Sequence, residues 1–227
     1  MEDKTIKAIA IIADVIDSRK NTKEKELQDV GQSLDKKYKQ DCIIPFTVRS
    51  GDELFAVLSN YSKAYSVLKD LFICSEHKDI PLYVGIGIGT VFEGNKDANN
   101  INGSAIWHAS DALEQLKSND SSVKYFKSKS GTFKYAFFAN DETKPDMLIN
   151  FMTAFILEKI DSRTDKQAEV IRMYEAHPDN TLEEIGQKLG YQKNPGINVS
   201  KTLARSNYHF THAAEHELIQ LLKQIQD

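Results

Sequence analysis

The side chains best suited to chemistry in this sequence are carboxylates near its beginning. Asp14 follows a short apolar run, and Asp52 follows Gly51 in a turn signal between two apolar segments. Hard cations such as Mg²⁺ prefer oxygen ligands, commonly one or two carboxylates together with substrate phosphates. Paired carboxylates also build the two-metal sites of phosphoryl transfer. We therefore expect Asp14 and Asp52 to be metal ligands if the fold brings them together.

An ordinary structural role is the alternative for these carboxylates. Asp is common where a strand ends, and Gly-Asp is common in turns. Asp17, Ser18 and Arg19 follow the first carboxylate directly and either cap the next helix or hold a phosphate. Two interpretations stay open on this basis: a metal or nucleotide site, or a set of turn and capping residues.

The charge distribution points to a second kind of partner. Lys+Arg 29 against Asp+Glu 33 gives a net charge of −4, which excludes a uniformly basic nucleic-acid-binding protein. Any contact with nucleic acid must therefore come from a local patch. Such a patch exists, because no Asp or Glu occurs between Glu184 and Glu215. Its Lys and Arg residues are Lys188, Lys193, Lys201 and Arg205.

A helix predicted over 196–206 lies inside this acid-free stretch. Val199 and Leu203, four residues apart, would be buried and leave polar side chains on the opposite face. Asn, Arg and Lys read base edges in the major groove, and Thr hydroxyls favour phosphates. The alternative is a solvated helical bundle that only packs on the preceding domain. The expected contacts to double-stranded DNA are Lys193, Asn198, Lys201, Thr202 and Arg205.

The elements that must position the carboxylates alternate between strands and helices. Apolar runs and helical stripes predict a strand, a helix, two strands, a helix and a strand, in that order. This order is the split βαβ pattern of the α+β ferredoxin-like sandwich, in which the first strand and the hairpin are neighbours. The predicted segments are 6–13, 22–40, 46–49, 53–58, 61–76 and 82–91, followed by a helix over 103–117 and short strands over 123–127 and 133–138.

The last third of the chain predicts helices only. An apolar helix over 147–160 connects two domains, and a capping box begins at Thr181. Short helices with a glycine-containing connection are typical of a helix-turn-helix. The predicted helices are 165–176, 181–189, 196–206 and 211–225. The expected parts are a ferredoxin-like domain over 1–142, a linker helix over 143–162 and a helix-turn-helix domain over 163–227.

The cysteines exclude a disulfide framework and a zinc site. Cys42 and Cys74 form no Cys-x-x-Cys pair, and no second His or Cys lies at ligand spacing from His108. We expect both as reduced thiols in a cytoplasmic protein. The apolar run over 6–13 is too short for a membrane span, which needs roughly 20 residues, and lacks the features of a signal peptide. We therefore expect no membrane partner.

The N-terminal segment resembles the palm of class III nucleotidyl cyclases and of GGDEF enzymes. The matches are Asp14 at the end of the first strand and Gly51-Asp52 in the following hairpin. The resemblance implies that Asp14 and Asp52 hold Mg²⁺. It also implies nucleotide contacts from Gly51, Asp52, Glu53 and Gly87.

The transition-state half of a cyclase site is missing from this match. Trp107 and Asp111 stand where the family carries an Asn and an Arg. Trp has no amide, and Asp would repel phosphates, so we expect Trp107 in the core instead. Gly85, Gly87 and Gly89 alternate along one predicted strand, where they form the floor beneath a nucleotide or make room for a helix.

Nearly the full chain resembles the SatD family of bacterial proteins. The matches are residues 11–19, Gly51-Asp52, residues 103–105 with 111–113, and the helices from Gln167 to Leu203. Those helices also resemble sigma-factor region 4 and LuxR-type regulators. The resemblance implies a palm domain followed by DNA-binding helices.

These observations together predict a DNA-binding, transcription-regulatory protein rather than an enzyme. Its palm would sense a nucleotide with Mg²⁺ or would dimerise, and we expect a homodimer. No catalytic residue is assigned. The alternative is an active nucleotidyltransferase or cyclase that uses Mg²⁺ held by Asp14 and Asp52.

Overall fold

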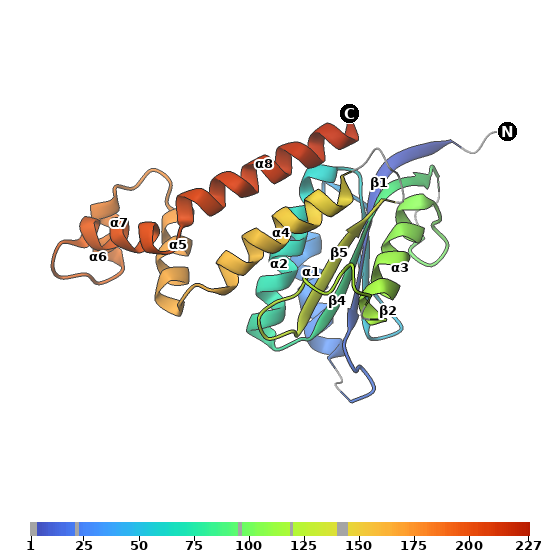
Figure 1. The fold of residues 1–227 in the computed structure, drawn as a ribbon, viewed down its shortest axis with the longest axis horizontal. Coiled ribbons are helices and arrows are strands. Elements are labelled where there is room, and N and C mark those ends of the chain that lie inside the picture. Colours follow the sequence, from blue (N-terminus) through green and yellow to red (C-terminus); the bar gives the residue numbers. More distant parts are fainter. Residues whose placement is uncertain (1–3, 21–22, 95–96, 119, 140–144) are drawn as a thin grey trace. The chain divides into compact units, whose positions relative to one another are not determined.

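The chain forms two compact units (Figure 1). The first, called the sheet unit, contains Met1–Ala154 and Leu218–Asp227, and the second, called the helical unit, contains Phe155–Glu217. The computed structural model describes residues 4–20, 23–94, 97–118, 120–139 and 145–227.

The sheet unit confirms the α+β class and the predicted order of elements. Both predicted helical stripes, which include Leu27 and Leu34 in the first helix and Leu68 and Phe72 in the second, are buried. The elements are β1 (Thr5–Val15), α1 (Glu24–Tyr38), β2 (Cys42–Arg49), β3 (Glu53–Leu58), the 3₁₀ turn η1 (Tyr61–Lys63), α2 (Ala64–Lys78), β4 (Leu82–Phe92), α3 (Ser104–Lys117) and β5 (Phe133–Phe138).

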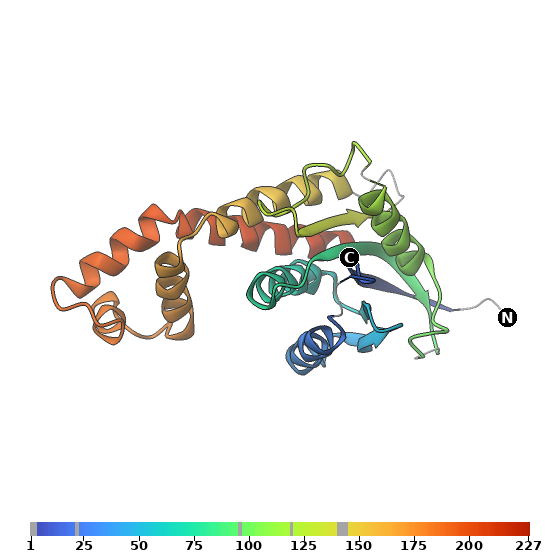
Figure 2. The ribbon, with the colours of Figure 1, turned by 90° about the horizontal axis from the view of Figure 1, so that it is seen from below.

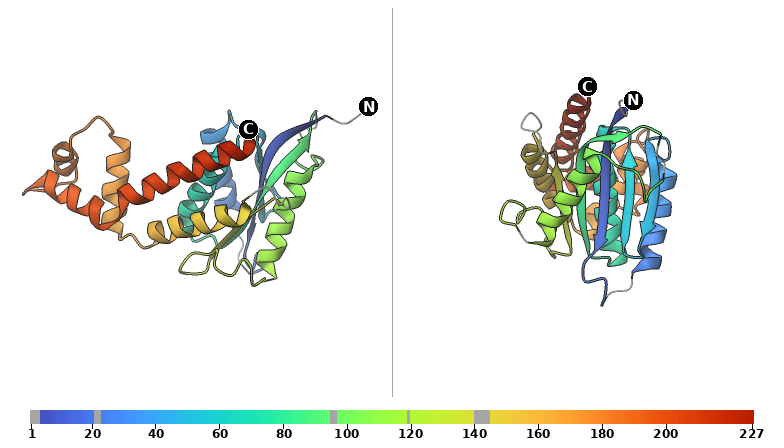
Figure 3. Two further views of the ribbon diagram at one scale, coloured as in Figure 1. Left: turned by 45° about the horizontal axis from the view of Figure 1, so that its top comes forward. Right: turned by 90° about the vertical axis from the view of Figure 1, so that its right-hand side faces the viewer.

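The five strands form one sheet in the order β2-β3-β1-β4-β5. The central strand β1 pairs antiparallel with β3 and β4, and β4 pairs parallel with β5. Residues 8–13 of β1 are all buried, as expected for an apolar run covered on both faces. Figures 1 and 2 show α1 and α2 on one face of the sheet and α3 on the other. The right-hand view of Figure 3 shows α3 in front of the strands.

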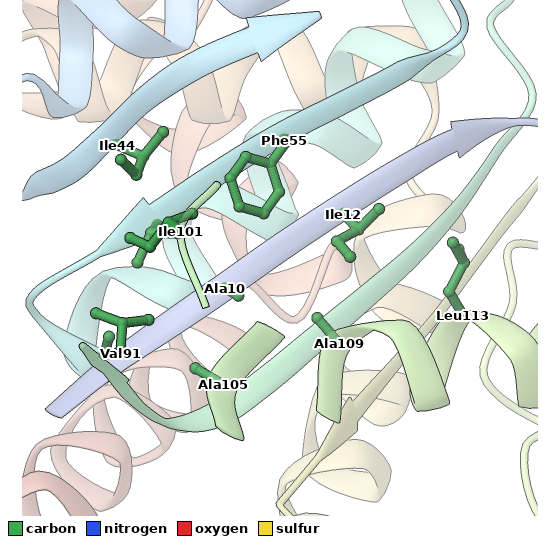
Figure 4. Packing of buried hydrophobic residues seen from close by; sticks show 11 residues of the cluster. Ala10, Ile12, Ile44, Phe55, Val91, Ile101, Ala105, Ala109 and Leu113 are labelled. Atoms are coloured by element: carbon green, nitrogen blue, oxygen red, sulfur yellow. The ribbon is translucent and has the colours of Figure 1, made fainter. Parts of the chain in front are cut away.

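Three glycines of β4 allow α3 to lie directly on the sheet. A Cβ atom on Gly85 or Gly87 would stand 2.2 or 1.9 Å from a carbonyl oxygen of α3, and one on Gly89 would stand 2.6 Å from the Ala105 nitrogen. Ala105 and Ala109 of α3 then pack with β1 and β3 residues in one apolar cluster (Figure 4). The interpretation of these glycines as room for a helix is therefore favoured over a nucleotide floor.

Two predicted strands differ from the structure. Residues 123–127 form turns with a single bridge, Lys127 to Lys134, because Asp120 and the following serines build a turn there. β2 begins at Cys42 and runs through Pro45, which the prediction placed before the strand. Proline is tolerated because β2 is an edge strand of the sheet.

The helical unit carries short helices with well-defined starts. Thr164 and Thr181 each form a capping box, as predicted for Thr181, and Pro195 occupies the first turn of α7. Val170, Ile185, Val199 and other apolar residues form its core. The helices are α4 (Asp146–Asp161), α5 (Asp165–Ala176), α6 (Leu182–Lys188), α7 (Pro195–Arg205) and α8 (Tyr208–Gln226).

The ends of α4 and α8 depart from the predicted domain limits. α4 begins in the sheet unit, where the Asn150 side chain exchanges two hydrogen bonds with the Phe137 backbone of β5. The last turns of α8 also belong to the sheet unit. There Gln226 accepts a hydrogen bond from the Tyr61 N–H (2.9 Å) and donates one to the Ser59 carbonyl (2.6 Å). Within the described residues, no helix has both the length and the apolar character to cross a membrane.

The contact between β4 and α3 predicts a large effect of a small substitution. Gly87→Ala is expected to lower the free energy of unfolding by about 3 kcal/mol, since both clashing atoms are backbone and neither can move aside. Urea unfolding followed by circular dichroism measures the loss. The control is Gly131→Ala, which has open space but a φ of +75° and is expected to cost about 1 kcal/mol. Equal losses in both variants would contradict the packing described here.

Candidate functional site

A row of polar side chains crosses the sheet at the end that carries the β2–β3 turn. In the strand pairing, Asp14 lies opposite both Glu53 and Tyr83. Arg49 lies opposite Glu53, and Lys134 lies opposite Tyr83. Residues directly opposite each other in a sheet share a face, so all five side chains project to one side. That side is the one covered by α3, because Lys117 of α3 pairs with Asp14.

Asp14 is held by an ion pair within the sheet unit. The Lys117 ammonium lies 2.6 Å from Oδ2 of Asp14, whose side chain is only 17% exposed. A cation therefore already occupies one side of this carboxylate. Among the residues the structure describes, no group of three or more His, Cys, Asp or Glu side chains is placed to hold a metal ion.

Glu53 is also paired, in this case with Arg49. Nε and Nη2 of Arg49 lie 2.7 and 2.6 Å from Oε1 of Glu53. The same guanidinium donates from Nη1 to the Ala98 carbonyl and lies 3.8 Å from the centre of the Phe55 ring. These contacts fix Glu53 as part of a structural ion pair. Its predicted contact to a nucleotide would require this pair to open.

Asp52 does not face Asp14 as predicted. Antiparallel pairing places Glu53 opposite Asp14, and it is the Asp52 backbone carbonyl that accepts the Val15 N–H at 3.0 Å. The hairpin turn needs left-handed backbone at Ser50 (φ 53°) and Gly51 (φ 86°). The two aspartates line separate surface hollows, so the expected carboxylate pair is not assembled in this structure.

The two hollows adjoin each other. The first, called the Asp14 hollow, has a volume of about 320 Å³, and the second, called the Asp52 hollow, has about 300 Å³. Ser18 and Arg19 line both, so the turn after β1 stands between the aspartates. The Asp14 hollow is lined by Asp14, Val15, Asp17, Ser18, Arg19, Lys20, Tyr83 and Lys117, and the Asp52 hollow by Ser18, Arg19, Lys23, Glu24, Ser50, Gly51 and Asp52.

Two expectations for α3 and β4 are wrong. The backbone of α3 fills the space where a side chain of Gly87 would lie. A nucleotide therefore cannot contact Gly87 from that side. Trp107 is not in the core but is 54% exposed, and its Nε1–H donates to Asn102 Oδ1 at 2.8 Å. Ala105 and Ala109 face the sheet, and Trp107 lies between them in sequence, on the outer side of the helix. Asp111 is exposed as well.

Two basic side chains and one aromatic side chain in or beside this row were not predicted from the sequence. Lys117, Lys134 and Tyr83 were not predicted as site residues, yet they lie beside or opposite one another at the sheet end. One signal for them was present in the sequence: lysines recur between 117 and 134 with Asp120 as the single acidic residue. Strand pairing brings Tyr83 and Lys134 together, and the packing of α3 on β4 places Lys117 beside Asp14.

The predicted DNA-contacting residues lie on or just before α7. Val199 and Leu203 are buried, as predicted, and Lys193, Lys201 and Arg205 are exposed. These three cations are therefore available on the surface of the helical unit.

Asn198 and Thr202 are used differently from the prediction. Both are half-buried. Asn198 Nδ2 donates to the Lys193 carbonyl, and the Thr202 hydroxyl donates to the Asn198 carbonyl, each at 2.8 Å. The first bond fixes the connection before α7, and the second lies within the helix. Both side chains thus support the local backbone in this structure.

Neither cysteine has the character of a catalytic nucleophile. Burial raises the pKa of the Cys42 thiol to about 12, with further contributions from the charges of Asp35 and Asp41. Burial also raises the pKa of the Cys74 thiol, helped by Asp70. Since the thiolate is the reactive form, both side chains are largely protonated and inert near neutral pH.

The raised thiol pKa predicts slow alkylation. At pH 8 Cys42 of the native protein is expected to react with iodoacetamide about a thousandfold more slowly than a free thiol, because little thiolate is present. Cys74 is also expected to react more slowly than a free thiol. The alkylation rate of Cys42 should still rise above pH 9, whereas that of an ordinary thiol approaches its maximum there because most of the thiol is already ionised. Mass spectrometry of Cys42→Ser and Cys74→Ser variants reports each thiol separately, with the urea-unfolded protein as control. Fast labelling of the native protein at pH 8 would contradict this account.

No curated protein matches the chain. A solved structure of a bacterial light-regulated adenylyl cyclase is similar with a TM-score of 0.43 and 11% identity, over 66% of this chain and 46% of that chain. This chain therefore spans less than half of that protein's length. The model of the SatD family matches residues 8–193, a range that ends before α7 begins. Because this range covers most of the chain, the protein belongs to the SatD family.

Proposed function

We propose that this protein binds double-stranded DNA through α7 and regulates transcription. The observation that carries the proposal is a set of exposed cations at α7. Lys201 and Arg205 lie on one side of this helix, whose other side is buried, and Lys193 lies just before it. Between Glu184 and Glu215 no acidic residue opposes this charge. Lysine and arginine at such a surface neutralise phosphates and, in the major groove, contact base edges.

The packing of α6 and α7 supports a helix-turn-helix. A Cβ on Gly186 would stand 2.5 Å from Pro195, so the start of α7 lies directly against α6. The Gly196 N–H also donates to Glu183 Oε2 at 2.9 Å. In helix-turn-helix proteins the second helix enters the major groove while the first crosses the backbone. In this proposal α7 is the recognition helix.

Within the proposed interface the five predicted residues divide into two roles. Lys193, Lys201 and Arg205 contact DNA, since their charged groups face solvent. Asn198 and Thr202 fix the start and turn of α7, because their donors are satisfied inside the protein. This division changes the predicted contact set without changing the predicted surface.

For the sheet unit we propose a ferredoxin-like, cyclase-like palm that binds a nucleotide without converting it. The βαββαβ order of its first elements and the surface hollows at the sheet end support ligand binding. Trp107 and Asp111 replace the groups a cyclase needs at the transition state. The carboxylates do not fit a resident Mg²⁺ site, since Asp14 and Glu53 are each paired with a cation and Asp52 lines another hollow.

The first prediction concerns the DNA surface. Lys201→Ala/Arg205→Ala is expected to weaken binding of a mixed-sequence duplex about tenfold or more and to lower the salt dependence by about two phosphate contacts. Fluorescence anisotropy at several salt concentrations measures both quantities. Lys166→Ala/Arg172→Ala is the matched control, because it removes one exposed Lys and one exposed Arg from α5. Equal losses of DNA affinity in the two double variants would contradict the assignment of α7 to the interface.

The second prediction concerns catalysis. With ATP or GTP and Mg²⁺ or Mn²⁺, no cyclic nucleotide or pyrophosphate should form, and chromatography of the reaction mixture detects either product. The alternative function is a nucleotidyl cyclase or transferase that uses Asp14. Product that appears with the parent and disappears in Asp14→Ala would establish that alternative and overturn the proposal of a binding palm.

A further inference from the structure

The connection from α3 to β5 concentrates lysines at one edge of the sheet unit. Asp120 is the single acidic residue between positions 117 and 134. Lys124 and Lys127 are exposed on this connection, and Lys134 lies half-buried at the start of β5. The full set is Lys117, Lys124, Lys127, Lys129 and Lys134. Neither the DNA-binding proposal nor the predicted metal site accounts for this concentration of charge.

The backbone places two of these lysines face to face. An isolated antiparallel bridge pairs Lys127 with Lys134, and the Tyr135 N–H donates to the Phe126 carbonyl beside it at 3.0 Å. Directly opposite residues project to the same side, and like charges in that position repel. Both lysines line one surface hollow.

A small hollow forms where these lysines converge. Its volume is about 80 Å³, which suits a group the size of a phosphate. Three of its lining side chains are cationic, and one is a carboxylate. We call it the lysine hollow; it is lined by Leu116, Asp120, Val123, Lys124, Lys127 and Lys134.

The one carboxylate of the lysine hollow is engaged with the turn rather than with a lysine. Asp120 Oδ1 accepts hydrogen bonds from the Ser122 N–H (2.8 Å) and hydroxyl (2.7 Å). In the part of the chain that the structure describes, no carboxylate forms an ion pair with Lys124 or Lys127. Among the described residues, the charges of Lys124 and Lys127 are therefore not neutralised by an ion pair with a carboxylate.

The lysine hollow continues toward the Asp14 hollow. The Lys134 ammonium lies 5.0 Å from the centre of the Tyr83 ring, and Tyr83 lines the Asp14 hollow. On α3, Leu116 lines the lysine hollow and the next residue, Lys117, lines the Asp14 hollow. A ligand with several linked phosphates could therefore contact cations in both hollows.

We infer that the lysine hollow binds a phosphate group of a triphosphate chain. Ammonium groups are compact point charges that bind phosphate oxygens from several directions, and three of them converge here. The chain belongs either to a nucleoside triphosphate or to inorganic triphosphate, which share this chemistry. The inference rests on the proposed ligand binding by the sheet unit and assigns the residues that would perform it.

The test is calorimetric titration of the full-length protein with inorganic triphosphate, ATP and GTP, without added metal. Lys124→Ala/Lys127→Ala is expected to weaken binding of all three ligands about tenfold or more, since two charged contacts are removed. Lys36→Ala/Lys39→Ala is the matched control, because both residues are exposed at the end of α1 and the charge change is identical. The control should bind like the parent. Tighter binding of ATP or GTP than of inorganic triphosphate would identify a nucleoside triphosphate, rather than inorganic triphosphate, as the ligand.

Several outcomes would overturn the inference. Unchanged binding in Lys124→Ala/Lys127→Ala would show the phosphate to lie elsewhere, while the proposed nucleotide binding would stand. No binding of any of the three ligands by the parent would refute both the lysine hollow and the binding palm. Duplex DNA is titrated into the same samples. Loss of DNA binding in this variant, with triphosphate binding unchanged, would assign the lysines to a nucleic-acid surface.

Discussion

The architecture of the sheet unit depends on the close approach of α3 to the glycines of β4. At Gly87 even a methyl group would overlap the helix backbone, so the position and rotation of α3 are fixed by β4. That rotation turns Ala105 toward the sheet and Trp107 toward solvent. It also places Lys117, at the end of the helix, beside Asp14. The charge balance at the sheet end therefore follows from a packing constraint, not from the local sequence around Asp14.

This constraint changes the chemistry that the carboxylates could perform. Asp14 and Glu53 each have a basic partner within 3 Å, so their charges are used inside the sheet unit. Lysines at this end of the unit, from the α3–β5 connection and the start of β5, line a separate surface hollow. We propose that this end of the unit binds a phosphate group rather than a divalent cation. The helical unit also presents positive charge, on the exposed side of α7 and just before it rather than in a hollow.

Sequence periodicity predicted most of the fold because its stripes are long and regular. The buried faces of α1 and α2, the turn at Gly51 and the capping box at Thr181 follow directly from local patterns. The site was harder to predict, because it depends on strand register. A shift of one residue in the pairing decides whether Asp52 or Glu53 faces Asp14, and no local signal encodes it. The segment 123–127 has the composition of a strand. It forms turns instead, because the Asp120 side chain accepts a hydrogen bond from the Ser122 N–H just before it.

In the proposals made here the two units bind different phosphate ligands: duplex DNA on α7, and a triphosphate in the lysine hollow. Hydrogen–deuterium exchange of the full-length protein, with each ligand added separately, distinguishes the two sites. We expect DNA to slow exchange over residues 191–206 and not over 120–135, and inorganic triphosphate to slow exchange over residues 120–135 and not over 191–206. Protection of 120–135 by DNA, or of neither segment by its ligand, would contradict these proposals.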